Sequence, residues 1–167
     1  MAEPKITASE MANCLLLRGG MSHLKLQKLL FYCQAFHLAV FDEPLFADDF
    51  EAWMHGPVVR SVWNDCRDHS VLHNGLSLTD LGKEKAKQSF EKLSKDQTDL
   101  IDDVLAEYEP HSAYKLECLT HSEKPWIDAR AGIAHDAASK NIIPKKSIGD
   151  FYRTMIYGAD EQKIQTG

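Results

Sequence analysis

The chain has 167 residues, of which 44% are hydrophobic, so it is long and apolar enough to fill the core of one domain. Its 19 basic and 25 acidic residues give a formal charge of -6 and are interspersed, which argues against nucleic acid as the main partner. No apolar run approaches the length of a membrane span, and the first residues lack the basic start and apolar stretch of a signal peptide. We therefore expect a cytoplasmic protein that has no membrane partner.

A first helix is predicted close to the N-terminus. Thr7 or Ser9 can cap it, Glu10 lies in its first turn, and Gly19-Gly20 stops it.

The longest helical pattern in the chain covers residues 22–41. Its apolar residues fall on one helical face and on a second row a heptad apart, so only a stripe around Lys25, Lys28 and Ala35 is left to face water. Ser22 is placed to cap the start of this helix. The pattern predicts a buried central helix around which the domain is built.

The next segment is rich in aromatic and turn residues. Residues 50–54 partly alternate, which predicts a brief strand, and residues 55–57 read as a turn. Pro57 suits the first position of a helix, so a third helix is expected over residues 58–67.

Residues 69–82 give mixed signals. Asn74-Gly75 is a strong turn dipeptide, which permits a small hairpin or an extended excursion. Thr79 can instead cap an exposed polar helix that follows it.

The second half of the chain reads as a series of helices. Ser94 and Gln97 have the spacing of a capping box at the start of a helix that continues to Tyr108, and Ser112 opens another that runs to His121. A short helix is expected over residues 126–131.

A polar linker is expected over residues 141–144, before the last helix. Ser147 is the expected cap of that helix, and four apolar residues are expected to point inward: Ile148, Phe151, Tyr152 and Met155.

Together these patterns predict a mainly α fold. We expect a single compact helical domain around a buried central helix, with at most a small β-hairpin or short strand pair. The domain should cover residues 1–158, and residues 159–167 should form a flexible tail.

The cysteines give little sign of chemistry. They are widely spaced without a C-x-x-C pair and read as reduced core residues: Cys14, Cys33, Cys66 and Cys118. Residues at a spacing typical of metal ligands occur only at Asp65, Cys66, His69 and His73. A four-ligand site would need a second cluster of ligands, which the sequence lacks. We predict neither a metal nor another cofactor.

No motif for phosphate cradles, dinucleotide binding or hydrolase chemistry is present, so we expect no enzymatic activity. The helices over residues 94–108 and 112–121 have the proportions of a helix-turn-helix, which leaves DNA binding open. The second of them offers Lys115, Glu117 and His121, which is not a phosphate-binding face.

Two motifs, over residues 53–59 and 119–126, combine an aromatic residue, a histidine and a turn proline. Trp and His at turns suit either a hydrogen-bond network that locks the fold or a contact surface. The pattern favours the structural role and leaves the contact surface open.

These motifs also carry a family resemblance. Residues 24–34 (LKLQKLLFYCQ) resemble the LKLQKLLYYAQ helix of the Panacea domain, also called SocA-like or GepA-like. Residues 44–46 (PLF), 51–53 (EAW), 55–58 (HGPV) and 119–130 (LTHSEKPWIDAR) are similar to further elements of that family, in the same order. The resemblance extends over most of residues 7–157. It departs at Phe31 and Phe36, where Tyr and Trp are more usual.

The resemblance implies an antitoxin from a bacterial or prophage toxin-antitoxin operon, which neutralises a cognate toxin protein by binding it. In one branch of the family the antitoxin is an adaptor that delivers its toxin to the ClpX/ClpP protease (ClpXP), so this alternative stays open. The family implies no catalytic residues. From the two motifs and the residues that follow them, we expect the partner-binding surface to include Trp53, His55, Gly56, Pro57, Val58, Thr120, His121, Glu123, Trp126 and Arg130.

Overall fold

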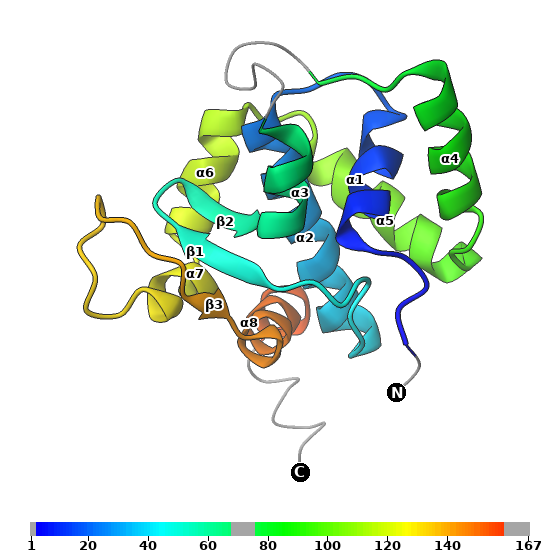
Figure 1. Cartoon of the computed structure of the whole chain (residues 1–167). Coiled ribbons are helices and arrows are strands. Elements are labelled where there is room, and N and C mark those ends of the chain that lie inside the picture. Colours follow the sequence, from blue (N-terminus) through cyan, green and yellow to red (C-terminus); the bar gives the residue numbers. More distant parts are fainter. Residues whose placement is uncertain (1–2, 68–75, 159–167) are drawn as a thin grey trace.

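The computed structural model describes residues 3–67 and 76–158 and confirms the mainly helical fold class. Eight helices and three short strands lie within these residues: α1 (Ala8–Leu16), α2 (His23–Phe41), β1 (Phe50–Trp53), β2 (Gly56–Val59), α3 (Arg60–Cys66), α4 (Asp80–Phe90), α5 (Lys95–Tyr108), α6 (Ala113–His121), α7 (Lys124–Ala129), β3 (Ile142–Ile143) and α8 (Lys145–Tyr157). Figure 1 shows α2 passing through the middle of the molecule, with the small sheet in front of it and helices around it.

Helix α2 is the predicted central helix and is buried along almost its whole length. It packs against α1, α5, α6 and α8 and against β2. Ser22 caps its start by accepting a hydrogen bond from the backbone N–H of Lys25, and Asp42 ends it in a left-handed conformation with φ 56°. The expected water-facing stripe was wrong, because Lys28 and Ala35 are fully buried. A helix surrounded on all sides leaves no face for water.

Four of the predicted caps of the surrounding helices are confirmed. A side-chain oxygen accepts a hydrogen bond from the backbone N–H three residues later at Thr7, Thr79, Ser94 and Ser112. The caps of α1 and α5 are full capping boxes, because the side chain at the third helical position accepts from the N–H of the cap residue. Ser9, the alternative cap of the first helix, lies inside α1.

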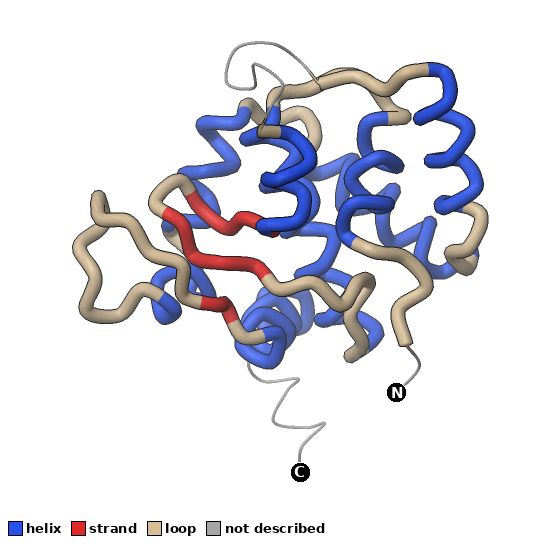
Figure 2. Tube along the Cα trace, viewed as in Figure 1, coloured by secondary structure: helices blue, strands red, loops and turns tan. Residues whose placement is uncertain are grey.

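The sheet is antiparallel with the strand order β2-β1-β3 (Figure 2). Met54 and His55 form the turn between β1 and β2, so Gly56 and Pro57 lie in a strand and not in the turn as expected. The third helix was also expected too early, since α3 begins only at Arg60. β-Branched Val58 and Val59 favour an extended backbone, and an edge strand tolerates proline.

A third strand replaces the linker that was expected over residues 141–144. Ile142 and Ile143 pair with Glu51 and Phe50 of β1. Ile143 is fully buried by this pairing. A two-residue strand has too little sequence to show a period of two, so only its partner strand defines it.

The last two helices begin earlier than predicted. Pro144, not Ser147, is the N-cap residue of α8, and the Ser147 hydroxyl donates to the carbonyl oxygen of Pro144 from within the helix. Ile148 and Tyr152 are buried as predicted, whereas Met155 is exposed. Met155 lies in the last turn of α8, just before the helix ends at Tyr157.

The predicted Asn74-Gly75 turn and the predicted tail over residues 159–167 lie outside the described residues. Next to the first of these gaps, Leu76 pairs with Met21 in an isolated antiparallel bridge. Of the helices in the described ranges, none has the length and apolar character that crossing a membrane requires.

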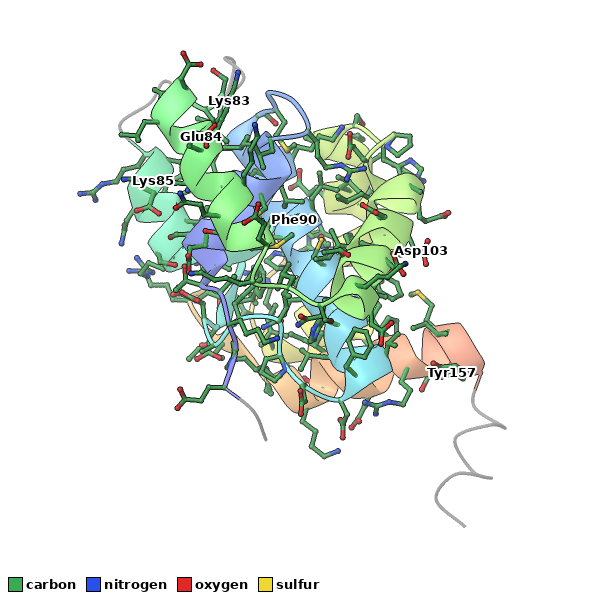
Figure 3. The ribbon with its side chains drawn as sticks, turned by 90° about the vertical axis from the view of Figure 1, so that its right-hand side faces the viewer. Lys83, Glu84, Lys85, Phe90, Asp103 and Tyr157 are labelled. Carbon is green, nitrogen blue, oxygen red and sulfur yellow. The ribbon has the colours of Figure 1, made fainter. Side chains whose placement is uncertain are left out.

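Charged side chains cover the side of the molecule formed by α4 and α5 (Figure 3). Lys83, Glu84 and Lys85 are exposed on α4, and Asp103 is exposed on α5. Between the two helices, Phe90 is only partly exposed and helps to line a small cavity of about 150 Å³. This side therefore carries a solvated surface over a packed apolar interior.

Candidate functional site

The fold brings the two sequence motifs together, because the β1–β2 hairpin lies against α6 and α7 (Figures 1 and 2). His55 Nδ1 in the hairpin turn lies 2.7 Å from Glu117 Oε1 on α6. Trp126 Nε1 on α7 donates to the carbonyl oxygen of Trp53 at 2.8 Å. Seven of the ten predicted partner-binding residues are buried at this junction: Gly56, Pro57, Val58, Thr120, Glu123, Trp126 and Arg130.

Trp126 is the centre of a stacked group of side chains. The imidazole of His121 stacks on its indole with ring centroids 4.1 Å apart, and the Arg130 guanidinium lies 4.9 Å from the indole centroid. Arg130 also donates to the carbonyl oxygens of Ala52 and Ala134, both at 2.9 Å. These contacts tie α7 and the following loop to β1, which is a structural role.

Lys28 fills the space beneath the hairpin. Its side chain is fully buried, and Nζ donates to the carbonyl oxygen of Pro57 at 3.0 Å. Gly56 lies directly against it, with a positive φ of 107° and too little room for a side chain. Thr120 closes the other side, and its hydroxyl donates to the carbonyl oxygen of Glu117 at 2.8 Å.

Burial lowers the pKa of Lys28 to about 7, although the charge of Glu117 opposes this shift. In the unfolded chain the amine keeps its ordinary pKa of about 10.5. Between these two values the unfolded chain binds more protons than the native protein. The contribution of Lys28 to the free energy of unfolding therefore rises with pH through this window.

A Lys28→Met variant is expected to lose this pH dependence. From about pH 6.5 to 8.5, the free energy of unfolding of the wild type should rise by about 2 kcal/mol relative to the variant. Urea unfolding of both proteins across this range measures the difference. Lys83→Met removes an exposed lysine and should show no such trend. A constant difference between wild type and Lys28→Met would contradict the prediction.

Glu123 joins α7 to the core through its carboxylate. Oε1 accepts hydrogen bonds from the hydroxyls of Tyr32 at 2.6 Å and Tyr152 at 2.8 Å. Burial raises the pKa of Glu123 against these hydrogen bonds, which favour the charged form. Glu123 thus links α2 and α8, which gives a structural reason for a glutamate at this position of the motif over residues 119–130.

Three predicted residues keep access to solvent: Trp53 and His121 are half-buried, and His55 is exposed. Trp53, His55 and Val58 line a cavity of about 570 Å³, which we call the aromatic groove. The described residues that line it are His23, Leu24, Gln27, Trp53, Met54, His55, Val58, Trp63, Glu117, Ala138, Ser139 and Lys140. The volume is in the range of ligand-binding pockets.

Sequence reasoning missed most of this lining. Trp63 lies within the range of the expected third helix but was not considered for the site, and Glu117 was considered only in connection with DNA binding. The lining comes from α2, the hairpin, α3, α6 and the loop before β3. No local pattern connects such distant segments, so only the tertiary structure can show that they meet.

The geometry gives little support to a metal site at the residues with metal-like spacing. In the described parts of the chain, no group of three or more His, Cys, Asp or Glu residues could hold a metal ion. The Asp65 carboxylate accepts a hydrogen bond from the Ser9 hydroxyl at 2.6 Å, Cys66 is buried, and His69 and His73 lie outside the described residues.

Three of the four cysteines are buried, and the expectation of a core position was wrong for Cys118, which is exposed. Burial raises the pKa of Cys14 and Cys66 to about 11 and that of Cys33 to about 12, which favours the unreactive thiol.

The first helix of the possible helix-turn-helix presents a surface that is unsuited to DNA. The solvent-facing side of α5 is acidic, with Asp96, Asp99, Asp102 and Asp103 all exposed. An acidic face repels phosphate groups.

Comparison with protein-family models matches residues 26–127 to the family described as antitoxin SocA-like, Panacea domain. This range begins inside α2, contains the hairpin and the groove-lining residues of α3 and α6, and ends in α7. Comparisons with curated proteins and with solved structures gave no match. The matched range exceeds half of the chain and confirms the resemblance seen in the sequence. The chain therefore belongs to the family of SocA-like antitoxins with a Panacea domain.

Proposed function

We propose that this protein is an antitoxin that neutralises a cognate toxin protein by direct binding through the aromatic groove. Membership of the antitoxin family supports a protein partner. The observation that carries the proposal is the groove itself, because it is an open apolar cavity lined by exposed residues of the hairpin turn and of the loop before β3. An apolar surface left open in this way is typical of a protein-binding site.

The groove has the features of an interaction hot spot. Two tryptophans, Trp53 and Trp63, lie in contact with ring centroids 5.1 Å apart, and Met54 is exposed beside them. Tryptophan is enriched among residues that dominate binding energy, and methionine adapts to irregular partners. We also propose that residues 1–158 form the Panacea-like antitoxin domain.

A co-expression experiment tests this function. The neighbouring open reading frame is induced with and without this protein, and growth and the level of the neighbouring product are scored. Met54→Glu, which places a charge in the groove without removing a buried side chain, should reduce rescue by at least about tenfold in viable counts. Leu81→Glu, at an exposed leucine of α4, is the matched control and should rescue fully.

The level of the toxin separates the two modes of neutralisation. Rescue at an unchanged toxin level is expected for direct inhibition. Rescue that lowers the toxin level and requires ClpP would instead identify an adaptor for the ClpXP protease. Equal rescue by the wild type and by Met54→Glu would exclude the groove as the binding surface.

A further inference from the structure

The aromatic groove has a rigid apolar wall made of three rings. Trp63 contacts Trp53 edge-on and stacks on His23, with centroid distances of 5.1 and 5.0 Å. Burial lowers the pKa of His23 to about 4, so this imidazole is neutral near pH 7 and brings no positive charge to the wall. The wall therefore presents the π faces and edges of aromatic rings to the groove.

Two polar side chains of the groove lining, Gln27 and Trp53, are already hydrogen-bonded within the chain. The Gln27 side chain accepts from the backbone N–H of Val59 at 2.9 Å and donates to its carbonyl oxygen at 3.3 Å. Trp53 Nε1 donates to Glu51 at 2.9 Å. The hydrogen bond from Arg60 is the main cause that lowers the pKa of the Glu51 carboxyl, and the charge of Lys140, which lines the groove, adds to this effect.

Among the described residues of the lining, Glu117 is the one carboxylate, and it faces two histidines. Only 15% of its side chain is exposed, and Oε1 lies 2.7 Å from His55 Nδ1 and 3.9 Å from His121 Nε2. Within residues 3–67 and 76–158, both of its ion pairs are with histidines. Lys28 interacts electrostatically with Glu117 from inside the fold, but burial lowers the pKa of the Lys28 amine to about 7. A largely buried carboxylate without an arginine or lysine at ion-pair distance favours binding of an external cation.

We propose that the aromatic groove receives an arginine side chain of the toxin, with the Glu117 carboxylate as its counter-ion and the Trp53–Trp63 wall as its apolar seat. This rests on the proposed function. A guanidinium group suits the site because it stacks on aromatic rings and binds carboxylates through a planar array of donors. Within this chain, the Arg60 guanidinium already lies 5.3 Å from the centroid of Trp53 and pairs with Glu51. The formal charge of -6 would also steer a basic partner toward the protein.

The test measures binding of the purified product of the neighbouring open reading frame to immobilised full-length chain. Glu117→Gln keeps the size of the side chain and its ability to accept from His55, so the fold should persist; thermal unfolding checks this. We expect its affinity for the toxin to fall by on the order of tenfold or more. Asp103→Asn, which neutralises an exposed acid of α5, is the control and should bind like the wild type.

The salt dependence of binding distinguishes two roles of Glu117: a counter-ion for the arginine, or a residue that only shapes the groove. The ratio of wild-type to Glu117→Gln affinity should shrink as salt rises, because screening weakens a charge pair. A loss that does not change with salt overturns the proposal, since it marks a structural role.

The remaining outcomes of the binding experiment differ in which proposal they overturn. Equal binding by the wild type and Glu117→Gln overturns the arginine site but leaves direct toxin binding in place. If Glu117→Gln binds normally and Trp63→Leu does not, the groove takes an apolar side chain, and the arginine site is likewise overturned. Failure of the wild type to bind the product overturns this inference together with the proposed function.

Discussion

Gly56→Ala is expected to lower the free energy of unfolding by about 3–5 kcal/mol. Gly56 has a φ of 107°, which disfavours any residue with a β-carbon. A Cβ at this position would lie 2.6 Å from Lys28 Cε and 3.0 Å from Thr120 Oγ1. Lys28 is fully buried and its Nζ donates to the carbonyl oxygen of Pro57, so moving the side chain away would break a buried hydrogen bond. Urea unfolding measures the loss.

Two further variants separate backbone strain from steric overlap. Gly132 also has a positive φ, 83°, but a β-carbon added there would meet no atom within 4 Å, so Gly132→Ala should cost only about 1–2 kcal/mol. Combining Gly56→Ala with Lys28→Ala removes the nearest clash. The double variant should then be more stable than the sum of the single effects predicts. Equal losses for Gly56→Ala and Gly132→Ala would show that the overlap with Lys28 has no energetic effect.

Trp126→Ala is expected to destabilise the protein by about 4–5 kcal/mol. Only 2% of this side chain is exposed, so its removal leaves a large cavity between α7 and the hairpin. The Arg130 guanidinium and the His121 imidazole would lose the ring on which they stack. The carbonyl oxygen of Trp53 would also lose its hydrogen-bond donor. Chemical unfolding at neutral pH measures the change.

Trp126→Phe is the matched control, because it keeps an aromatic ring but not the indole N–H. Its cost should stay near 1–2 kcal/mol, the cost of a lost hydrogen bond and of imperfect packing. Tyr114→Ala, at a strongly exposed aromatic residue of α6, should change stability by less than about 0.5 kcal/mol. A Trp126→Ala protein as stable as the wild type would contradict the structural role assigned to this residue.

These expectations change the interpretation of the two sequence motifs. Trp and His near turns were compatible both with a contact surface and with a network that locks the fold. Trp126 and Arg130 are buried and hydrogen-bonded to the hairpin, so their contacts serve the fold. Partner binding stays a prediction, now centred on Trp53 and His55, which reach the groove. Mutating both motif tryptophans together would therefore mix a folding defect with a binding defect.

Local patterns in the sequence were sufficient for much of the fold. The period of α2 and the capping residues at Thr7, Ser94 and Ser112 depend on side chains within one helical turn of each other. Such short-range interactions can be read without knowing the rest of the structure. The strand β1 was also anticipated, because its aromatic residues partly alternate.

The sequence was insufficient to predict contacts between elements that lie far apart in the chain. β3 is defined only by its pairing with β1, and β2 was taken for the beginning of a helix because Pro57 suits both positions. Lys28 was expected in water because lysine is rarely buried, and a helical wheel does not show that a hairpin will cover it. In each case the deciding partner lies far away in the sequence.

The sequence by itself therefore determined the helical class, the central helix and most helix starts, since these rest on residue spacing along the chain. Its motifs also showed the resemblance to the antitoxin family, which the family model confirms. The tertiary structure alone decided which motif residues are buried, how Lys28 and Gly56 fit together, and that Glu117 meets Trp53 and Trp63 in one groove. The physical reason is that burial and cavity shape depend on contacts between segments from α2, α3, α6 and the hairpin, and no spacing within one segment encodes those contacts.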